Sequence, residues 1–368
     1  MFGIYIHWPF CKSKCPYCDF FSKVPKTLEC DVWEKAYLTE LEQYATLLSD
    51  KQITSIFFGG GTPSLMPAKM MANLIQKIKT LWKTAEHLEI SMEGNPSSLQ
   101  GDKMEQFKEV GINRLSIGVQ ALNDADLKFL GRLHTSQQAI DVLTKAKSLF
   151  QNVSMDLIYA RPNQTEAQWE QELSTALSFD LPHYSLYQLT IEQGTFFHRK
   201  QVPQMDEDSA KNLFLLTDEL TKKAGVPRYE VSNHAKLGFE CRHNCLYWST
   251  EQWIGIGPAS HSRYTSNNTF HADENPKSLA DYLAGKKQKA ILSVDEKVME
   301  VVLMALRTKW GINAVEFEKM FSHPYTDFLN IKKIDEFCKE DYLISDETGL
   351  KATSDGLLIL DYLVEQLV

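Results

Sequence analysis

Short runs of apolar and β-branched residues recur along the first half of the chain, and longer amphipathic stretches separate them. The runs predict six strands, at residues 3–7, 53–58, 88–92, 114–118, 153–159 and 183–189. The stretches between them carry apolar residues at helical spacing and predict helices at 32–48, 68–82, 102–110, 136–150 and 166–177. This alternation is typical of parallel strands joined by crossover helices.

Two architectures share this alternation, a (β/α) barrel and an open doubly wound sheet. A full eight-stranded barrel usually occupies about 250 residues, whereas the six units here occupy about 190. We therefore expect an α/β fold built on a partial (β/α)6 barrel of the TIM type. In such barrels the carboxyl ends of the strands carry the site, so residues that follow each strand are the candidates for chemistry.

The pattern changes after the sixth strand. A helix is expected at 207–223, followed by an irregular stretch at 229–264 that is rich in Gly, Cys, His, Trp and Tyr. From residue 278 the pattern is helical again, with short elements near 342–344 and 350–353, which favours a small winged-helix-like module. The sequence thus predicts a barrel over 1–200, a connecting region over 201–285 that completes the cover of the site, and a C-terminal α/β module over 286–368.

Charge and hydropathy narrow the function classes. The 368 residues carry 39 Lys plus Arg against 48 Asp plus Glu, and the net charge of −9 argues against binding nucleic acid through bulk charge. No apolar stretch approaches the roughly 20 residues that a bilayer span needs, and no secretory signal is evident at the start. We expect a cytoplasmic protein without a transmembrane segment.

Three of the seven cysteines cluster directly after the first predicted strand. Cys11, Cys15 and Cys18 have the spacing C-x3-C-x2-C, and a reducing compartment favours metal binding over disulfides. Thiolates at this spacing can hold three irons of one [4Fe-4S] cluster and leave the fourth iron open to a substrate or cofactor. The alternatives are a structural zinc completed by His7 or a distant cysteine, and three thiols without a metal.

Residues 6–20 resemble the signature of the radical S-adenosylmethionine (SAM) superfamily, since they read IHWPFCKSKCPYCDF. The resemblance implies a [4Fe-4S] cluster on the three cysteines, with its open iron chelated by the amino and carboxylate groups of SAM. It also implies that Tyr17 lies beside the adenine and that Tyr5 is among the cofactor contacts. In this superfamily an electron from the reduced cluster cleaves SAM to a 5′-deoxyadenosyl radical.

Further residues at strand ends resemble the SAM contacts of the superfamily. Gly60, Gly61 and Thr62 belong to a GGGTP turn whose backbone can approach a ligand closely. Taken alone, this segment is also explained as a tight turn before a helix. The resemblance assigns it to the SAM amino group, and it assigns Glu93, after the third strand, to the ribose hydroxyls.

The fourth to sixth strands supply the remaining candidates. Gln120 and Arg132 match positions that contact the SAM carboxylate, to which a guanidinium fork is suited. Asp156 resembles the aspartate near the ribose and adenine, and Tyr187 is a candidate wall of the adenine or an ordinary core residue. Where relatives have Gly-Leu-Pro-Gly, residues 160–163 read Ala-Arg-Pro-Asn, so the asparagine must itself adopt any left-handed conformation there.

Within the superfamily the chain resembles the coproporphyrinogen dehydrogenase group essentially from end to end. Residues 116–135, 183–195 and 240–262 carry the resemblance, as SIGVQALNDADLKFLGRLHT, HYSLYQLTIEQGT and ECRHNCLYWSTEQWIGIGPASHS. One branch of this group contains the oxygen-independent coproporphyrinogen III oxidases, radical SAM decarboxylases of haem biosynthesis. The other contains the HemW-type haem chaperones, which bind haem and pass it to acceptor proteins.

Three features favour the chaperone branch. Position 20 is Phe where the oxidases have a fourth cysteine, the chain lacks their extension ahead of the first strand, and residues 242–248 include the His-Asn-x-x-Tyr-Trp element of the chaperones. The resemblance therefore implies a haem chaperone with a cluster and SAM, whose partners are haem or a porphyrin and a haem-acceptor protein. The alternative is the oxidase, and whether SAM is cleaved in turnover stays open at this point.

The haem ligand has three candidate residues, all within 241–245. His243 can supply an imidazole to haem iron, with aromatic surface beside it for the macrocycle. The alternatives are a hydrogen-bonded structural histidine and a thiolate ligand or metal site formed by Cys241 or Cys245. The remaining alternative belongs to a different functional class: a protein with a purely structural zinc or an interaction role. In that case every match to the SAM site would be a coincidence.

Overall fold

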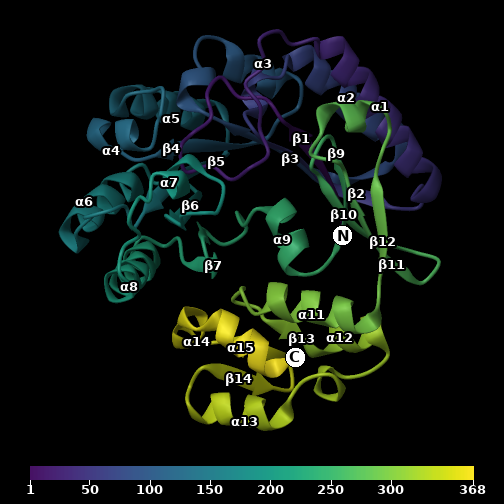
Figure 1. The fold of residues 1–368 in the computed structure, drawn as a ribbon, viewed down its shortest axis with the longest axis vertical. Coiled ribbons are helices and arrows are strands. Elements are labelled where there is room, and N and C mark those ends of the chain that lie inside the picture. Colours follow the sequence, from purple (N-terminus) through teal and green to yellow (C-terminus); the bar gives the residue numbers. More distant parts are fainter.

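The computed structural model describes all residues, 1–368, and Figure 1 shows a sheet wrapped by helices with a smaller module beside it. Six parallel strands form the centre of the sheet in chain order, so the predicted partial barrel is confirmed. These strands are β1 (Phe2–Trp8), β2 (Gln52–Gly60), β3 (Lys83–Gly94), β4 (Arg114–Gln120), β5 (Asn152–Tyr159) and β6 (His183–Gln188).

Helices cover the outer face of the sheet. Their inward faces are apolar at helical spacing, as in the second helix, which buries Met71, Leu74 and Ile78. Thr135 and Thr165 begin two of the helices with a capping box to a glutamine three residues later. The helices of this part are α1 (Cys30–Leu47), α2 (Ala68–Leu81), α3 (Lys103–Glu109), α4 (Asp124–Phe129), α5 (Ser136–Leu149), α6 (Glu166–Leu177), α7 (Phe196–Arg199) and α8 (Glu207–Lys223).

The stretch expected to be irregular, 229–264, instead extends the sheet at both edges. On one side, β9 (Gln252–Ile256) pairs parallel with β1, and an antiparallel meander of β10 (His261–Ser266), β11 (Thr269–Glu274) and β12 (Gln288–Leu292) follows. The other side carries β8 (Asn233–Ala235) and β7 (Arg228–Glu230) next to β6. The sheet has 12 strands with two free ends, β12 and β7, so the barrel does not close.

The C-terminal residues form a module with its own core of 16 buried apolar residues. A three-stranded sheet in the order β13-β15-β14 packs against helices, and the succession helix, strand, helix, helix, strand, strand is that of a winged helix. Its elements are α11 (Val294–Ala305), β13 (Ile312–Asn313), α12 (Ala314–Phe321), α13 (Ile331–Lys339), β14 (Leu343–Asp346), β15 (Gly349–Ala352), α14 (Ser354–Leu358) and α15 (Leu360–Leu367); α10 (Leu279–Leu283) precedes them.

One short helix, α9 (Arg242–Trp248), lies between the barrel and this module, as Figure 1 shows. It packs against β1, β2 and β9 on one side and against α11 on the other. The carboxylate of Glu89, on β3, accepts the backbone N–H groups of Arg242 and His243 at its first turn. The helix is thereby anchored to the barrel at the end opposite the cysteine loop.

None of the helices is both long and apolar enough to cross a bilayer.

Candidate functional site

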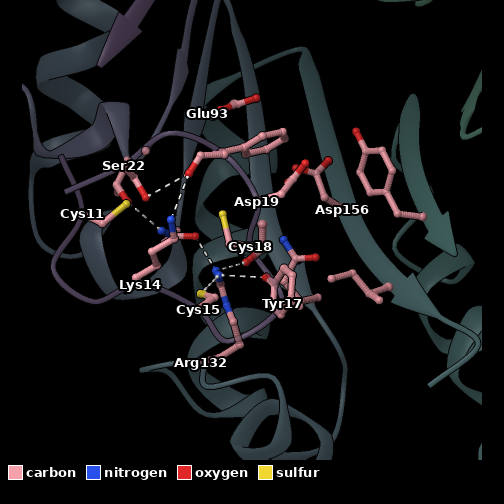
Figure 2. A pocket seen from close by; sticks show the side chains of 18 of the residues that line it. Cys11, Lys14, Cys15, Tyr17, Cys18, Asp19, Ser22, Glu93, Arg132 and Asp156 are labelled. Atoms are coloured by element: carbon pink, nitrogen blue, oxygen red, sulfur yellow. Dashed lines mark hydrogen bonds between the residues drawn. The ribbon is translucent and has the colours of Figure 1, made fainter. Parts of the chain in front are cut away.

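A cavity of about 340 Å³ opens at the carboxyl ends of the barrel strands. It is lined by the cysteine loop after β1, the glycine turn after β2, and the ends of β3 to β6. Figure 2 shows Cys11, Cys15 and Cys18 around it together with Glu93, Arg132 and Asp156. Twelve of the residues predicted from the sequence line it: Cys11, Cys15, Tyr17, Cys18, Gly60, Gly61, Thr62, Glu93, Gln120, Arg132, Asp156 and Tyr187. Parallel strands bring their ends together, which explains how residues far apart in sequence share one site.

The cysteine loop is held closed at its base by backbone hydrogen bonds. The N–H of Cys11 donates to Lys23 O over 2.9 Å, and the N–H of Lys23 donates to Pro9 O over 2.7 Å. The N–H of Cys18 donates to Cys15 O over 3.2 Å inside the loop. All three thiols are free and line the same cavity.

The thiols fit the expected cluster better than a zinc ion. No three ligating side chains converge on one metal position anywhere in the chain, which is what a zinc site requires. In a cubane each cysteine binds a different iron, so thiols spread around a cavity suit it. Thr62 Oγ1 donates to Cys11 Sγ over 3.4 Å, and Arg132 Nη1 donates to Cys15 Sγ over 3.3 Å, so donors to thiolate sulfur are present.

The glycine turn is shaped by the side chains beneath it. Gly60 has φ of +107°, and a Cβ there would lie 2.7 Å from the ring of His7. A Cβ on Gly61 would lie 2.9 Å from Phe10 O and 3.0 Å from Cys11 Sγ. Only glycine fits both positions, and the turn thereby brings bare backbone next to the cysteine loop.

Two carboxylates lie on the strand side of the cavity. Gly60 N–H donates to Glu93 Oε2 over 3.2 Å, and Ser116 Oγ donates to Asp156 Oδ1 over 2.9 Å. Burial raises the pKa of Glu93 to about 8, with repulsion from Asp156 as the second cause. Burial also raises the pKa of Asp156, against the hydrogen bonds of nearby serines. Both groups are suited to accept hydroxyl donors from a ligand such as a ribose.

Arg132 joins the cysteine loop to the strand ends. Its Nη2 donates to Gly118 O over 2.7 Å and to Asn95 Oδ1, and its Nη1 also reaches the Tyr17 hydroxyl over 3.4 Å. Asn95 donates in turn to Thr62 Oγ1 over 3.3 Å. Asn95 was missed from the sequence, although its place directly after the third strand could have indicated it.

Aromatic side chains line the opposite wall. Tyr17 packs toward Phe197 with ring centroids 6.4 Å apart, and Tyr187 remains 43% exposed at the cavity. Gln120, with φ of 73°, ends β4 in the left-handed region and lines the cavity beside them. The wall therefore offers flat apolar surface where a purine base can stack.

Two predicted residues lie elsewhere. Tyr5 is deeper in the barrel, where its hydroxyl lies 3.1 Å from Nδ1 of His7 and its ring stacks on His243 at 6.3 Å. His243, on α9, is fully buried, with Nδ1 2.8 Å from Ser55 Oγ and Nε2 2.8 Å from the Tyr247 hydroxyl. Neither residue lines the large cavity, so the structure separates them from the other candidates.

The loop that departs from the Gly-Leu-Pro-Gly pattern has a left-handed residue at each end. Asn163 has φ of 62°, as the sequence predicts, and Ala160 also has a positive φ, of 56°. Arg161 between them is nearly fully buried, donates from Nη1 to Ile158 O over 2.8 Å and pairs with Glu172. These contacts offset the strain of a left-handed alanine.

Comparison with known proteins gives a consistent result. The model of the family described as the radical SAM superfamily matches residues 5–176. A protein named heme chaperone HemW from Buchnera aphidicola subsp. Acyrthosiphon pisum is 33% identical over 99% of this chain and 97% of its own length. HemW from Haemophilus influenzae is 32% identical with the same coverage of both chains. The mouse protein named radical S-adenosyl methionine domain-containing protein 1, mitochondrial, is 32% identical over 98% of this chain and 86% of its own.

Among solved structures, coproporphyrinogen III oxidase (HemN) from Escherichia coli superposes with a TM-score of 0.83. The match covers 99% of this chain and 89% of that one, at 18% identity. At this identity the likeness concerns the fold.

Proposed function

The chain belongs to the radical SAM superfamily, in the family of proteins named heme chaperone HemW, and from this premise we propose that it is a haem chaperone that binds haem and transfers it to an acceptor protein. One observation carries the proposal, the match to HemW proteins over nearly the whole of both chains. The oxidase alternative has a likeness in fold at 18% identity, and Phe20 stands where the oxidases have their fourth cysteine.

We further propose that the cavity holds a [4Fe-4S] cluster and SAM. Cys11, Cys15 and Cys18 would bind three irons, and the fourth would be left for the amino and carboxylate groups of SAM. When bound, this pair of cofactors supplies one-electron chemistry. The protein residues bind and orient: Glu93 and Asp156 accept the ribose hydroxyls.

We propose that hydrogen-bond donors and aromatic side chains contact the carboxylate, the amino group and the adenine of SAM. Arg132 and Gln120 donate to the SAM carboxylate, the backbone of Gly60 and Gly61 meets its amino group, and Tyr17 and Tyr187 enclose the adenine. The site is at the ends of strands β1 to β6, where parallel barrels place their ligands.

For haem we propose the neighbourhood of α9, with His243 as the iron ligand. The helix also carries Tyr247 and Trp248, whose rings offer flat surface to a macrocycle. Either nitrogen of His243 can bind iron only after its present hydrogen bond, to Ser55 or Tyr247, is broken. Haem binding through this residue therefore requires α9 to shift, and we expect a slow phase after the first encounter.

A haemin titration of the anaerobically reconstituted protein tests the proposal, followed at the Soret band. We compare the wild type with His243→Ala and with His323→Ala, which removes an exposed histidine of the C-terminal module, just after α12. The wild type and His323→Ala should saturate near one equivalent, and His243→Ala should bind more weakly or shift the band. Equal saturation in all three proteins would keep haem binding and reject His243 as the ligand.

Absence of a saturable band in every protein would contradict the chaperone function itself. An assay of coproporphyrinogen decarboxylation with SAM would then test the oxidase. For transfer, haem-loaded protein is mixed with an apo-haem protein, and a Soret band that moves to the acceptor supports the second half of the proposal.

A further inference from the structure

A chain of buried hydrogen bonds crosses β5, β6 and β7 below the cavity. Ser154 Oγ donates to Asp156 Oδ1 over 3.1 Å and lies 2.8 Å from Nδ1 of His183. Nε2 of His183 lies 2.9 Å from the Tyr229 hydroxyl, which accepts the N–H of Cys241 over 3.3 Å. Ser154 and His183 are fully enclosed and Tyr229 is 1% exposed. These hydrogen bonds thus run from the cavity to Cys241, the residue that precedes α9.

The contacts of Tyr229 determine which atom donates in each of these hydrogen bonds. Its oxygen accepts the Cys241 N–H, and its own proton has one protein acceptor within hydrogen-bond distance, Nε2 of His183. A buried hydroxyl without an acceptor is unfavourable, so the phenol donates to Nε2. A neutral imidazole then carries its proton on Nδ1, which donates to Ser154. The Ser154 proton then has two acceptors within reach, Asp156 Oδ1 at 3.1 Å and Ser185 Oγ at 3.3 Å, and the carboxylate is the stronger of the two.

The surroundings keep His183 neutral. Burial lowers its pKa well below the ordinary value, and Arg114 and His234 repel an added proton. Arg114, His234 and Tyr229 are the titratable groups that face His183. The groups that face the carboxylate of Asp156 are Glu93, Arg114, Ser116, Ser154, Ser185 and Tyr187.

We propose that His183 is a positioning residue for SAM, which as the Nδ1–H tautomer fixes Ser154 as a donor to Asp156 and so presents this carboxylate as an acceptor to the ribose hydroxyls. The proposal rests on the assignment of Asp156 to SAM made above. His183 does not line the cavity, so it acts through Ser154 alone. With Ser116 on the same carboxylate, two hydroxyl donors favour the ionised form.

Two substitutions distinguish this positioning role from a packing role, because each retains a nitrogen near the position of one of the two imidazole nitrogens. His183→Asn places an amide N–H near the position of Nδ1, toward Ser154, whereas His183→Gln places one near Nε2, toward Tyr229. SAM affinity of the reconstituted protein is measured by calorimetry from pH 6 to 9, with Asp156→Asn as the reference. His183→Asn should stay within about twofold of the wild type, and His183→Gln should bind at least fivefold more weakly.

The pH profile adds a readout that a packing defect does not produce. Asp156 binds SAM as a carboxylate, so affinity falls as pH drops through its pKa, and loss of the Ser154 donor in His183→Gln moves this midpoint upward. Equal behaviour of the Asn and Gln variants would overturn the proposal. If Asp156→Asn binds SAM like the wild type, the assignment of Asp156 fails instead.

The tautomer is tested without any ligand. In the full-length chain labelled with 15N in the histidine rings, the resonance lost in His183→Gln should show a proton on Nδ1. A proton on Nε2 would overturn the proposal whatever the outcome for SAM.

Discussion

Arg132 and Cys15 are 117 positions apart in sequence, yet Nη1 of the arginine lies 3.3 Å from the cysteine sulfur. The same guanidinium donates to Gly118 O over 2.7 Å and to Asn95. A planar fork with fixed donors can make all these bonds at once, whereas an ammonium group cannot. Arg132 therefore ties the cysteine loop to the barrel strands as well as facing the cavity.

Substitution of Arg132 should distinguish what its positive charge contributes to SAM binding from what its hydrogen-bond geometry contributes. In Arg132→Lys the positive charge stays but the bonds to Gly118 and Asn95 cannot both form, so SAM should bind about tenfold more weakly, equivalent to about 1.4 kcal/mol. Calorimetric titration of SAM measures this. Arg199→Lys, at an exposed position of α7 that does not line the cavity, is the matched control and should bind like the wild type; an equal loss in both variants would refute the argument.

Cluster binding should depend on three cysteines and on no others. Cys18→Ser should lose most of the roughly four irons and four sulfides per chain that a cubane contributes. Cys30→Ser, at the start of α1, and Cys338→Ser, in α13, should retain them, because neither residue lines the cavity. Iron and sulfide analysis after anaerobic reconstitution measures the difference, and retention of the cluster by Cys18→Ser would show that the ligand set is wrong.

Gly60→Ala should destabilise the protein for two reasons that can be separated. A side chain at φ of +107° is strained, and the new Cβ would lie 2.7 Å from the His7 ring, for a combined loss of about 3 kcal/mol or more. Gly194 also has a positive φ, of 86°, but nothing lies within 4 Å of its Cβ position. Gly194→Ala should therefore lose only about 1 kcal/mol in urea unfolding, and equal losses would refute the steric contribution.

Glu93 should make stability depend on pH in the opposite direction to an ordinary ion-paired carboxylate. Burial raises its pKa from 4.5 to about 8 in the folded chain, so the folded state holds a proton that the unfolded state releases between these values. Stability therefore falls as pH rises from about 4.5 to 8. Glu93→Gln should weaken this trend, to which Asp156 also contributes, and be more stable than the wild type at pH 8.5, by roughly 2 kcal/mol.

Urea unfolding of the cluster-free chain at pH 5.5, 7 and 8.5 measures the trend. Glu192→Gln removes an exposed carboxylate from the same cavity and should keep the wild-type dependence. A parallel pH dependence in wild type and Glu93→Gln would contradict the prediction.

The sequence predicts the six central strands and most helices well because their signals are local. The helices at Glu166–Leu177 and Glu207–Lys223 begin and end at the predicted residues, and each begins with a side-chain cap, at Thr165 and Asp206. The pairing of β9 with β1 was missed. Its partners lie about 250 residues apart in the chain, and no periodicity reports a contact of that range.

The candidate site shows the same difference between features that the sequence predicts and features that depend on tertiary contacts. Residues at strand ends, such as Glu93 and Asp156, are placed by topology and meet as predicted. Asn95 acts through tertiary contacts with Arg132 and Thr62, which the sequence does not reveal. Tyr5 precedes His7 on the same face of β1 and so lies one layer deeper, where it meets His243 instead of the cavity.

The place of β1 between β2 and β9 has a consequence for biosynthesis. While the chain emerges from the ribosome, β1 can pair with β2 early, but its other edge stays open until residues 252–256 are made. An unpaired strand edge invites association with other chains. The segments that line the cavity on either side of the cysteine loop are synthesised long before that point. The loop can therefore meet iron and sulfide while this edge of β1 is still unpaired. Slow translation of the stretch between β6 and β9 would therefore lengthen the interval in which nascent chains can aggregate through β1.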